Sequence, residues 1–279
     1  MTPAEAAEAI IEDLGITRID ELDVDAIAFD AGIEVVYEAL TGCEATLVGV
    51  GDQAIATINP SPYRGRERFS VAHEVGHWEL HRGRSFRCRV DQVEENFASS
   101  REVEKEADTF ASHLLMPAGM FNEAIRSAGQ PNFKQLGDVA AAFDTSLTAT
   151  ALRLVGVDTL PVIIACYTRS GLRWYAAAKH VPRRWYLKDK VDEDSFAYDL
   201  LFSGKECRAL GKQPADTWFT NDDAGRYEVL EQCVPLRGDE VLVLLYLADS
   251  KMLYAGFDPG VGNRKYNEHG SYVAPRSKR

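Results

Sequence analysis

Two histidines and a glutamate occupy one short segment, at a spacing that allows them to act together. The segment reads His73-Glu74-Val75-Gly76-His77, so the histidines are four residues apart. In a helix this spacing places both side chains on one face, about one turn apart, where both imidazoles can bind a single Zn²⁺. Glu74 lies beside them and can accept a proton from a water molecule at the metal. We therefore predict a metal site with His73 and His77 as ligands and Glu74 as the catalytic base.

A catalytic zinc site has a third protein ligand, and Glu104 is the best candidate in the sequence. It lies in the run Glu104-Lys105-Glu106-Ala107-Asp108, where Glu104 and Asp108 share a helix face. A carboxylate one turn from the ligand can accept the free ring N–H of a metal-bound histidine and so fix its tautomer. We predict that Glu104 binds the metal, that Asp108 supports a histidine ligand, and that Glu106, on another face, is solvated.

His81 competes with Glu104 for the third position, because it follows His77 by four residues. It lies a further helical turn away and lacks the spacing of the third histidine in metzincins, so we favour a structural role for it. Taken alone, the acidic run around Glu104 fits a solvated helix surface. Zn²⁺ is the default metal for these residues, and Mn²⁺ or Fe²⁺ can also occupy sites of two histidines and a carboxylate.

Two helices are needed to bring these residues together. Apolar residues at helical spacing predict one helix over 66–82, which carries the histidines, and another over 101–115, which carries Glu104. The segment 83–100 between them has no clear period, and it begins basic and turns acidic. A long loop beside an active site is often functional, so we expect this segment to form a wall of the substrate cleft.

The other elements predicted before residue 160 are short helices and strands. Apolar spacing and terminal glycine, aspartate and proline residues indicate helices over 3–14, 24–31, 117–128, 132–142 and 146–155, and strands over 33–37, 45–50 and 54–58. The pair of helices within 132–155 resembles a helix-turn-helix. Its second helix contains one basic residue, Arg153, whereas a helix that reads DNA needs several basic or amide side chains. We favour packing or docking of a repressor protein at this pair.

The pattern changes beyond Leu160-Pro161, where we expect a domain boundary. The second half is predicted to contain strands over 162–167, 173–177 and 241–247, a helix over 194–202, and a strand over 251–257 that pairs with the one before it. The polar tail from about residue 260 is expected to be partly disordered. The fold class is therefore α+β, with one domain over 1–158 and a smaller mixed α/β domain over 159–279.

Composition restricts the class of protein further. The chain has 279 residues, a net charge of -12, and five scattered cysteines without a C-x-x-C pair. The cysteines favour reduced thiols in the cytoplasm over disulfides, and the charge makes nucleic-acid binding unlikely. No apolar stretch is long enough to span a bilayer and the N-terminus lacks the layout of a secretion signal, so we expect no membrane partner. The sequence does not indicate the oligomeric state.

Two longer runs resemble one family. These are Arg68-Phe69-Ser70-Val71-Ala72-His73-Glu74-Val75-Gly76-His77 and Glu104-Lys105-Glu106-Ala107-Asp108-Thr109-Phe110-Ala111-Ser112-His113-Leu114-Leu115-Met116-Pro117. Together, in this order and spacing, they resemble the ImmA/IrrE zinc metallopeptidases, and the resemblance covers about residues 20–155. Asp108 departs from the family, which often has asparagine there, but both residues can accept a hydrogen bond. Residues 160–279 resemble no family that we can name.

The resemblance implies a fold, an activity and a kind of substrate. The fold is a mostly helical, zincin-like metalloprotease domain with a small β-sheet, here over 1–158. The activity is metal-assisted peptide hydrolysis, with Glu74 as general base. The substrate is a helix-turn-helix transcriptional repressor, whose cleavage derepresses stress or mobile-element genes. The oxyanion also needs stabilisation, and the candidates for it are His113, His180 and several tyrosines. The domain over 159–279 either senses a ligand or recognises the substrate.

Two other functions fit the same residues. The chain could be a non-catalytic regulator in which zinc stabilises a surface that binds a partner protein. It could also be a regulator that binds DNA through the helix pair, although the net charge of -12 opposes this. A Glu74→Gln variant separates the first alternative from proteolysis, because only proteolysis needs the base. Binding to operator DNA at low salt tests the second.

Overall fold

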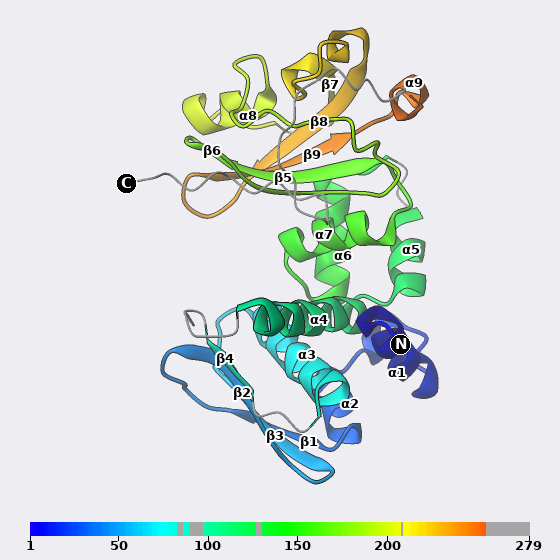
Figure 1. Ribbon diagram of the computed structural model, residues 1–279, viewed down its shortest axis with the longest axis vertical. Helices are drawn as coiled ribbons and strands as arrows, with labels where there is room; N and C mark the ends of the chain where they lie inside the picture. Colours follow the sequence, from blue (N-terminus) through cyan, green and yellow to red (C-terminus); the bar gives the residue numbers. More distant parts are fainter. Residues whose placement is uncertain (83–85, 90–96, 127–129, 208, 255–279) are drawn as a thin grey trace. The chain divides into compact units, whose positions relative to one another are not determined.

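The chain folds into two compact units. The computed structural model describes residues 1–82, 86–89, 97–126, 130–207 and 209–254 (Figure 1). We call Met1–Ser127 with Asp138–Ala149 the N-terminal unit, and Ala128–Gly137 with Thr150–Arg279 the C-terminal unit. The chain crosses between them within helices α6 (Phe133–Phe143) and α7 (Leu147–Val157). The domain limits expected from the sequence, 1–158 and 159–279, stay a prediction.

The N-terminal unit contains a four-stranded sheet. Its strands are β1 (Ile33–Tyr37), β2 (Cys43–Val50), β3 (Gln53–Ile58) and β4 (Phe86–Arg89), in the order β1-β3-β2-β4. β1 pairs with β3 in parallel, and the other pairs are antiparallel. Alternate residues Ala54, Ala56 and Ile58 of β3 are buried, as in a strand with one face on the core. The first three strands confirm the prediction, whereas β4 lies in the segment expected to be a loop.

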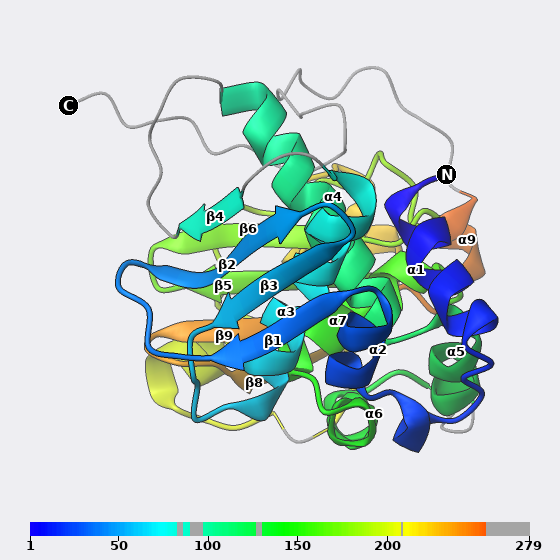
Figure 2. The same ribbon diagram turned by 90° about the horizontal axis from the view of Figure 1, so that it is seen from below.

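Five helices accompany this sheet in the described part of the N-terminal unit. They are α1 (Pro3–Asp13), α2 (Val24–Asp30), α3 (Arg64–Leu80), α4 (Phe97–Leu115) and α5 (Ala118–Arg126). α3 contacts β2 and β3, and Figure 2 looks through the sheet onto this helix. The helix predicted over 24–31 is confirmed as α2, and the Asp23 side chain caps it by accepting hydrogen bonds from the backbone N–H groups of Asp25 and Ala26. These elements hold α3 between the sheet and α4.

α3 and α4 approach each other closely at Gly76. A Cβ atom on Gly76 would lie 3.0 Å from Cδ1 of Phe110 and 3.2 Å from Cα of Ala107. Ala107 and Phe110 are fully buried, as is Val75 beside the glycine. Contact distances this short leave no room for a side chain, so the glycine determines how near α4 can come to the helix that carries the histidines.

The C-terminal unit contains a five-stranded antiparallel sheet. Its strands are β5 (Val162–Thr168), β6 (Gly171–Ala177), β7 (Gly211–Pro214), β8 (Glu228–Pro235) and β9 (Glu240–Tyr246), in the order β6-β5-β9-β8-β7. Every residue of β5 is buried, and so is the central part of β9. The three strands predicted over 162–167, 173–177 and 241–247 are therefore confirmed as β5, β6 and β9. β7 and β8 were not predicted.

Two predictions for the C-terminal unit differ from the structure. The strand expected over 251–257 is wrong for its described part, because Ser250–Leu253 forms the short helix α9, whose cap Asp249 accepts a hydrogen bond from the backbone N–H of Lys251. Residues 255–257 lie outside the described residues. The helix expected over 194–202 is a short α-helix, α8 (Phe196–Tyr198), followed by a π-helical turn, η2 (Asp199–Ser203). The polar tail from about 260 lies outside the described residues. Among the described helices, none is both long and apolar enough to cross a membrane.

A buried carboxyl group distinguishes β8. The side chain of Glu231 accepts hydrogen bonds from the backbone N–H of Ala197, at 2.8 Å, and from Nε1 of Trp218, at 3.0 Å. Glu231 has no exposed surface, and this burial raises the pKa of its carboxyl to about 7, against the lowering effect of the two hydrogen bonds. The folded chain therefore holds this proton at a pH at which the unfolded chain releases it.

The raised pKa of Glu231 predicts how the free energy of unfolding changes with pH. The pKa of the group rises on folding from 4.5 to about 7, so the unfolded chain loses the proton first as pH increases through this window. We expect the Glu231 carboxyl to reduce the free energy of unfolding by about 2 kcal/mol between pH 5 and pH 8. Glu231→Gln should remove this part of the dependence. Urea denaturation of both chains at several pH values measures it, and parallel stability curves would contradict the assignment.

Candidate metal centre

Helix α3 buries His73, Glu74 and His77. His73 is 8% exposed, His77 1% and Glu74 0%. The same part of the helix buries the apolar core residues Val71 and Val75. Imidazole and carboxylate groups are costly to bury unless other polar groups or a metal compensate them. A helix that carries three such groups into its buried face therefore indicates a site rather than a core surface.

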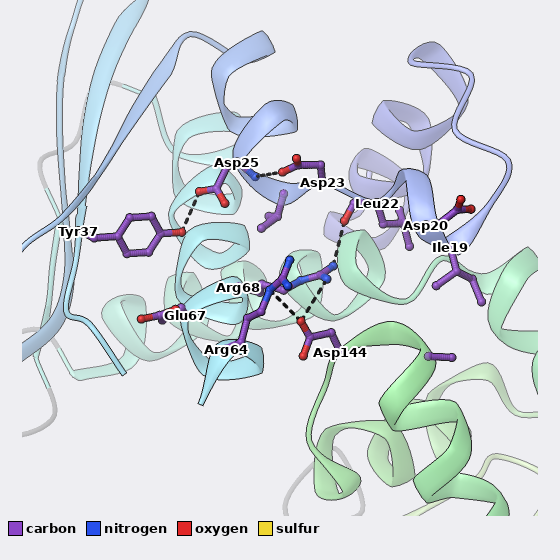
Figure 3. Close-up of a pocket in the computed structure, with 12 residues that line it drawn as sticks. Ile19, Asp20, Leu22, Asp23, Asp25, Tyr37, Arg64, Glu67, Arg68 and Asp144 are labelled. Atoms are coloured by element: carbon purple, nitrogen blue, oxygen red, sulfur yellow. Dashed lines mark hydrogen bonds and ion pairs between the residues drawn. The ribbon is translucent and has the colours of Figure 1, made fainter. Parts of the chain in front are cut away.

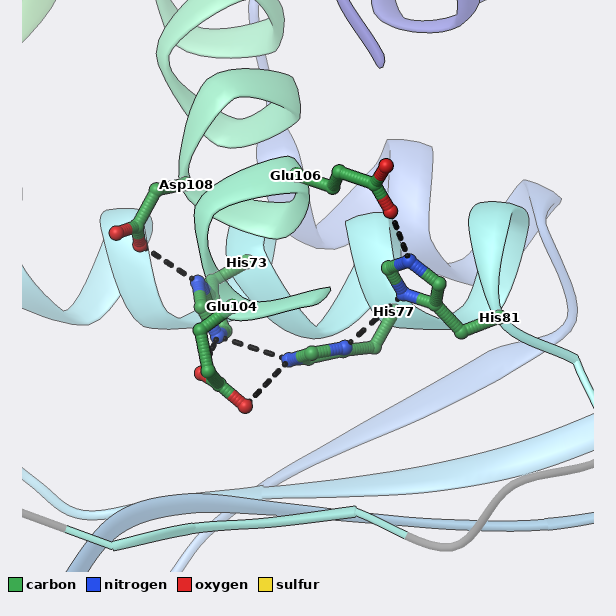
Figure 4. A network of polar contacts seen from close by, with 6 residues as sticks. All are labelled: His73, His77, His81, Glu104, Glu106 and Asp108. Atoms are coloured by element: carbon green, nitrogen blue, oxygen red, sulfur yellow. Dashed lines mark hydrogen bonds and ion pairs between the residues drawn. The ribbon is translucent and has the colours of Figure 1, made fainter. Parts of the chain in front are cut away.

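Glu104 completes a cluster with the two histidines. The Nε2 atoms of His73 and His77 are 3.0 Å apart (Figure 4). From α4, the carboxylate oxygens of Glu104 lie 3.2 Å from Nε2 of His73 and 3.6 Å from Nε2 of His77. Within the described residues, these three are the one group of at least three histidine, cysteine or acidic side chains placed to hold a metal ion. The structure thus brings together the three ligands that the sequence predicts.

The spacing of these atoms fits a zinc ion. Tetrahedral Zn²⁺ with bonds of about 2.0 to 2.2 Å separates its ligand atoms by about 3.3 to 3.6 Å. The two Nε2 atoms are 3.0 Å apart, and they lie 3.2 and 3.6 Å from different oxygens of the Glu104 carboxylate, so each separation approaches this range. Three protein ligands are also the number found in catalytic zinc sites, where the remaining position serves water or substrate.

The electrostatics of the cluster suit metal binding as well. Burial by itself would raise the pKa of Glu104, but hydrogen bonds with His73 and His77 and their charges outweigh it, so the pKa falls to about 2. Burial lowers the pKa of His77. The carboxylate is thus ionised and the imidazole neutral near pH 7, which are the states in which each offers a lone pair to a metal.

Asp108 contacts the outer nitrogen of His73. Its Oδ1 atom lies 3.0 Å from Nδ1 of His73, on the side of the ring away from Glu104 (Figure 4). A carboxylate can only accept here, so the ring hydrogen is on Nδ1 and the lone pair of Nε2 faces the cluster. This is the contact expected from the spacing of Asp108 and Glu104.

Two neighbours of the cluster contact each other. His81 is not among the clustered ligand atoms; its Nδ1 lies 3.2 Å from Nδ1 of His77. Glu106 is exposed, as the sequence predicts, and its Oε2 also lies 2.9 Å from Nε2 of His81, a contact that was not predicted. No local pattern relates residue 81 to residue 106. Their contact depends on how α3 and α4 pack.

The other residues considered from the sequence have different surroundings. Nδ1 of His113 lies 3.0 Å from Oε1 of Glu8, which joins α4 to α1. Nδ1 of His180, in the C-terminal unit, lies 3.0 Å from Oδ1 of Asp158. The segment 83–100, expected to form a wall of the cleft, lies largely outside the described residues.

A hollow in the N-terminal unit lies apart from the three clustered ligands. Its volume is about 420 Å³, and its lining includes none of the three ligands (Figure 3). Arg64 and Arg68, on the first turns of α3, reach Asp144 in the turn after α6 at 3.1 and 3.7 Å. Arg68 also donates to the backbone oxygen of Leu22 at 3.0 Å. These contacts hold the turn of the predicted helix pair against the helix that carries the histidines.

Comparison with known proteins agrees with this site. Residues 28–155 match the family Peptidase_M78, described as an IrrE N-terminal-like domain. Among solved structures, a Mycobacterium tuberculosis transcriptional regulator shares the fold with a TM-score of 0.58 and 16% identity, over 88% of this chain and 76% of that one. No curated protein sequence matches the chain. The matched family region includes both helices of the cluster. Over residues 28–155 this chain is therefore similar to the IrrE N-terminal-like domain of the Peptidase_M78 family.

Proposed function

We propose that this chain is a metal-dependent endopeptidase, with zinc as its metal, that cleaves a regulatory protein. One observation carries the proposal. Within a region that matches the Peptidase_M78 family, His73, His77 and Glu104 each offer a ligand atom, and these three atoms lie within 4.8 Å of one another. The family supports peptide hydrolysis, and the cluster supports a metal ion at its centre.

Each residue has a separate task in this chemistry. His73, His77 and Glu104 would hold the metal ion, whose Lewis acidity would polarise both water and the scissile carbonyl. Glu74 follows the ligand His73 on α3 and is fully buried. Its carboxylate accepts the proton of the attacking water and later passes it to the leaving amine. Asp108 holds the Nδ1 hydrogen of His73 and so keeps the ring in the tautomer that presents Nε2.

The substrate that we propose is a helix-turn-helix transcriptional repressor, cleaved at one or a few sites to derepress stress or mobile-element genes. The resemblance to the ImmA/IrrE family supports this class of substrate. The structural neighbour is named as a transcriptional regulator, which agrees with action on transcription. The net charge of -12 favours action through a partner protein over contact with DNA.

The proposal is tested with the purified chain and the repressor encoded nearest to its gene. We expect zinc-loaded protein to convert the repressor into defined fragments, chelation of the metal to stop the reaction, and added Zn²⁺ to restore it. Mass spectrometry of the fragments gives the cleavage site. A stable complex without fragments would contradict proteolysis and support the non-catalytic regulator. Binding of the chain to operator DNA would support the DNA-binding alternative.

A further inference from the structure

A chain of hydrogen bonds leads from the ligand His77 to the surface of α4. Nδ1 of His77 contacts Nδ1 of His81 at 3.2 Å, and Nε2 of His81 contacts Oε2 of Glu106 at 2.9 Å (Figure 4). The His81 side chain is 7% exposed, whereas that of Glu106 is 50% exposed. A nearly buried imidazole therefore connects a ring of the cluster to a carboxylate at the surface.

The chemistry of the three groups sets the position of each ring hydrogen. An ionised carboxylate only accepts hydrogen bonds, so Nε2 of His81 carries the hydrogen that Glu106 receives. In the tautomer of His81 with its single ring hydrogen on Nε2, the Nδ1 lone pair accepts a hydrogen bond from the Nδ1–H of His77. With its hydrogen on Nδ1, His77 presents a lone pair at Nε2, the atom that faces His73 and Glu104. The chain thus selects the metal-binding tautomer of His77.

The same principle applies to both histidines of the cluster. Nδ1 of His73 meets Asp108 directly at 3.0 Å, whereas Nδ1 of His77 reaches Glu106 through His81. Three acidic residues of α4 therefore have different positions around the cluster. Glu104 faces the metal position, Asp108 contacts His73 directly, and Glu106 reaches His77 through His81.

We propose that His81 and Glu106 are positioning residues for the metal ligand His77. The inference rests on the metal site of the proposed function, and it does not require proteolysis. The competing explanation is that the two residues only join the end of α3 to α4. That explanation predicts a change in the stability of the metal-free protein and no change in metal affinity. The two explanations therefore differ in a property that can be measured without a substrate.

The test compares zinc affinity in variants of the full chain, measured by competition with a chromophoric chelator. Loss of an outer-sphere partner typically weakens metal binding about 10- to 100-fold. We expect a loss in this range for His81→Phe, which removes the acceptor and keeps a ring, and a loss near its lower end for Glu106→Ala. Glu106→Gln should bind zinc nearly as the parent does, because its amide oxygen still accepts from His81. Glu102→Ala removes an exposed carboxylate of the same helix and is the matched control, expected to leave affinity unchanged.

Two further measurements separate positioning from stability. Urea denaturation of the metal-free variants gives their stability, and the absorption spectrum of the Co²⁺ form reports ligand geometry. We expect an altered Co²⁺ spectrum in His81→Phe, together with weakened zinc binding. Zinc affinity equal to the parent's in both His81→Phe and Glu106→Ala would overturn the proposal, whatever their stability. Weakened affinity without any peptidase activity in the parent would uphold it and overturn the proposed proteolysis alone.

Discussion

The Glu74→Gln variant is expected to bind zinc as the parent does and to cleave its substrate about 10²- to 10⁴-fold more slowly. Glutamine keeps the size of the side chain but cannot accept a proton from water. Glu74 is not one of the three clustered ligands, so metal content should remain the same. The measurements are the time course of fragment formation and the zinc content of the purified variant.

Controls for this result are available on the same helix. Glu79 of α3 is half-buried, with 27% of its side chain exposed, and contacts Arg82 beyond the end of the helix. Glu79→Gln makes the same chemical change away from the cluster and should cleave at the rate of the parent. Cleavage by Glu74→Gln at that rate would exclude Glu74 as the base. Full biological activity of Glu74→Gln, with loss of activity in His73→Ala, would favour the non-catalytic regulator.

Gly76→Val is expected to destabilise the N-terminal unit by about 3 kcal/mol and to weaken zinc binding. The first added carbon would lie 3.0 Å from Phe110 and 3.2 Å from Ala107, and valine adds two more carbons beyond it. The two helices must therefore separate. Because His73 and His77 are on α3 and Glu104 is on α4, separation pulls the third ligand away from the other two. Urea denaturation and chelator competition measure the two effects.

Gly119→Val is the matched control for that variant. Gly119 lies in α5, in the same unit, and a Cβ atom there would meet nothing within 4 Å. Valine at this position should leave stability and zinc affinity close to those of the parent, because no neighbour is displaced. If Gly76→Val and Gly119→Val behaved alike, the close approach of α3 and α4 would not be what places Glu104.

Much of the fold could be predicted because its patterns are local. The strand predicted over 54–58 and the helix predicted over 24–31 follow from residues close together in the sequence, and the structure confirms both as β3 and α2. β8 was missed because its buried side chains include the polar Glu231 and Gln232, which interrupt the apolar pattern of an inner strand. Their burial is possible only because the fold supplies partners, such as the indole of Trp218 for Glu231.

The sequence by itself indicated the candidate metal ligands and the resemblance to the family. Two histidines at helical spacing converge wherever the helix forms, and the acidic run of α4 indicated both Glu104 and Asp108. Only the tertiary structure decided which acidic residue serves which histidine, and it showed that His81 and Glu106 belong to the same network. The physical reason is that hydrogen bonds between α3 and α4 depend on the distance and orientation of the two helices. Packing at Gly76, rather than any local pattern, sets that distance.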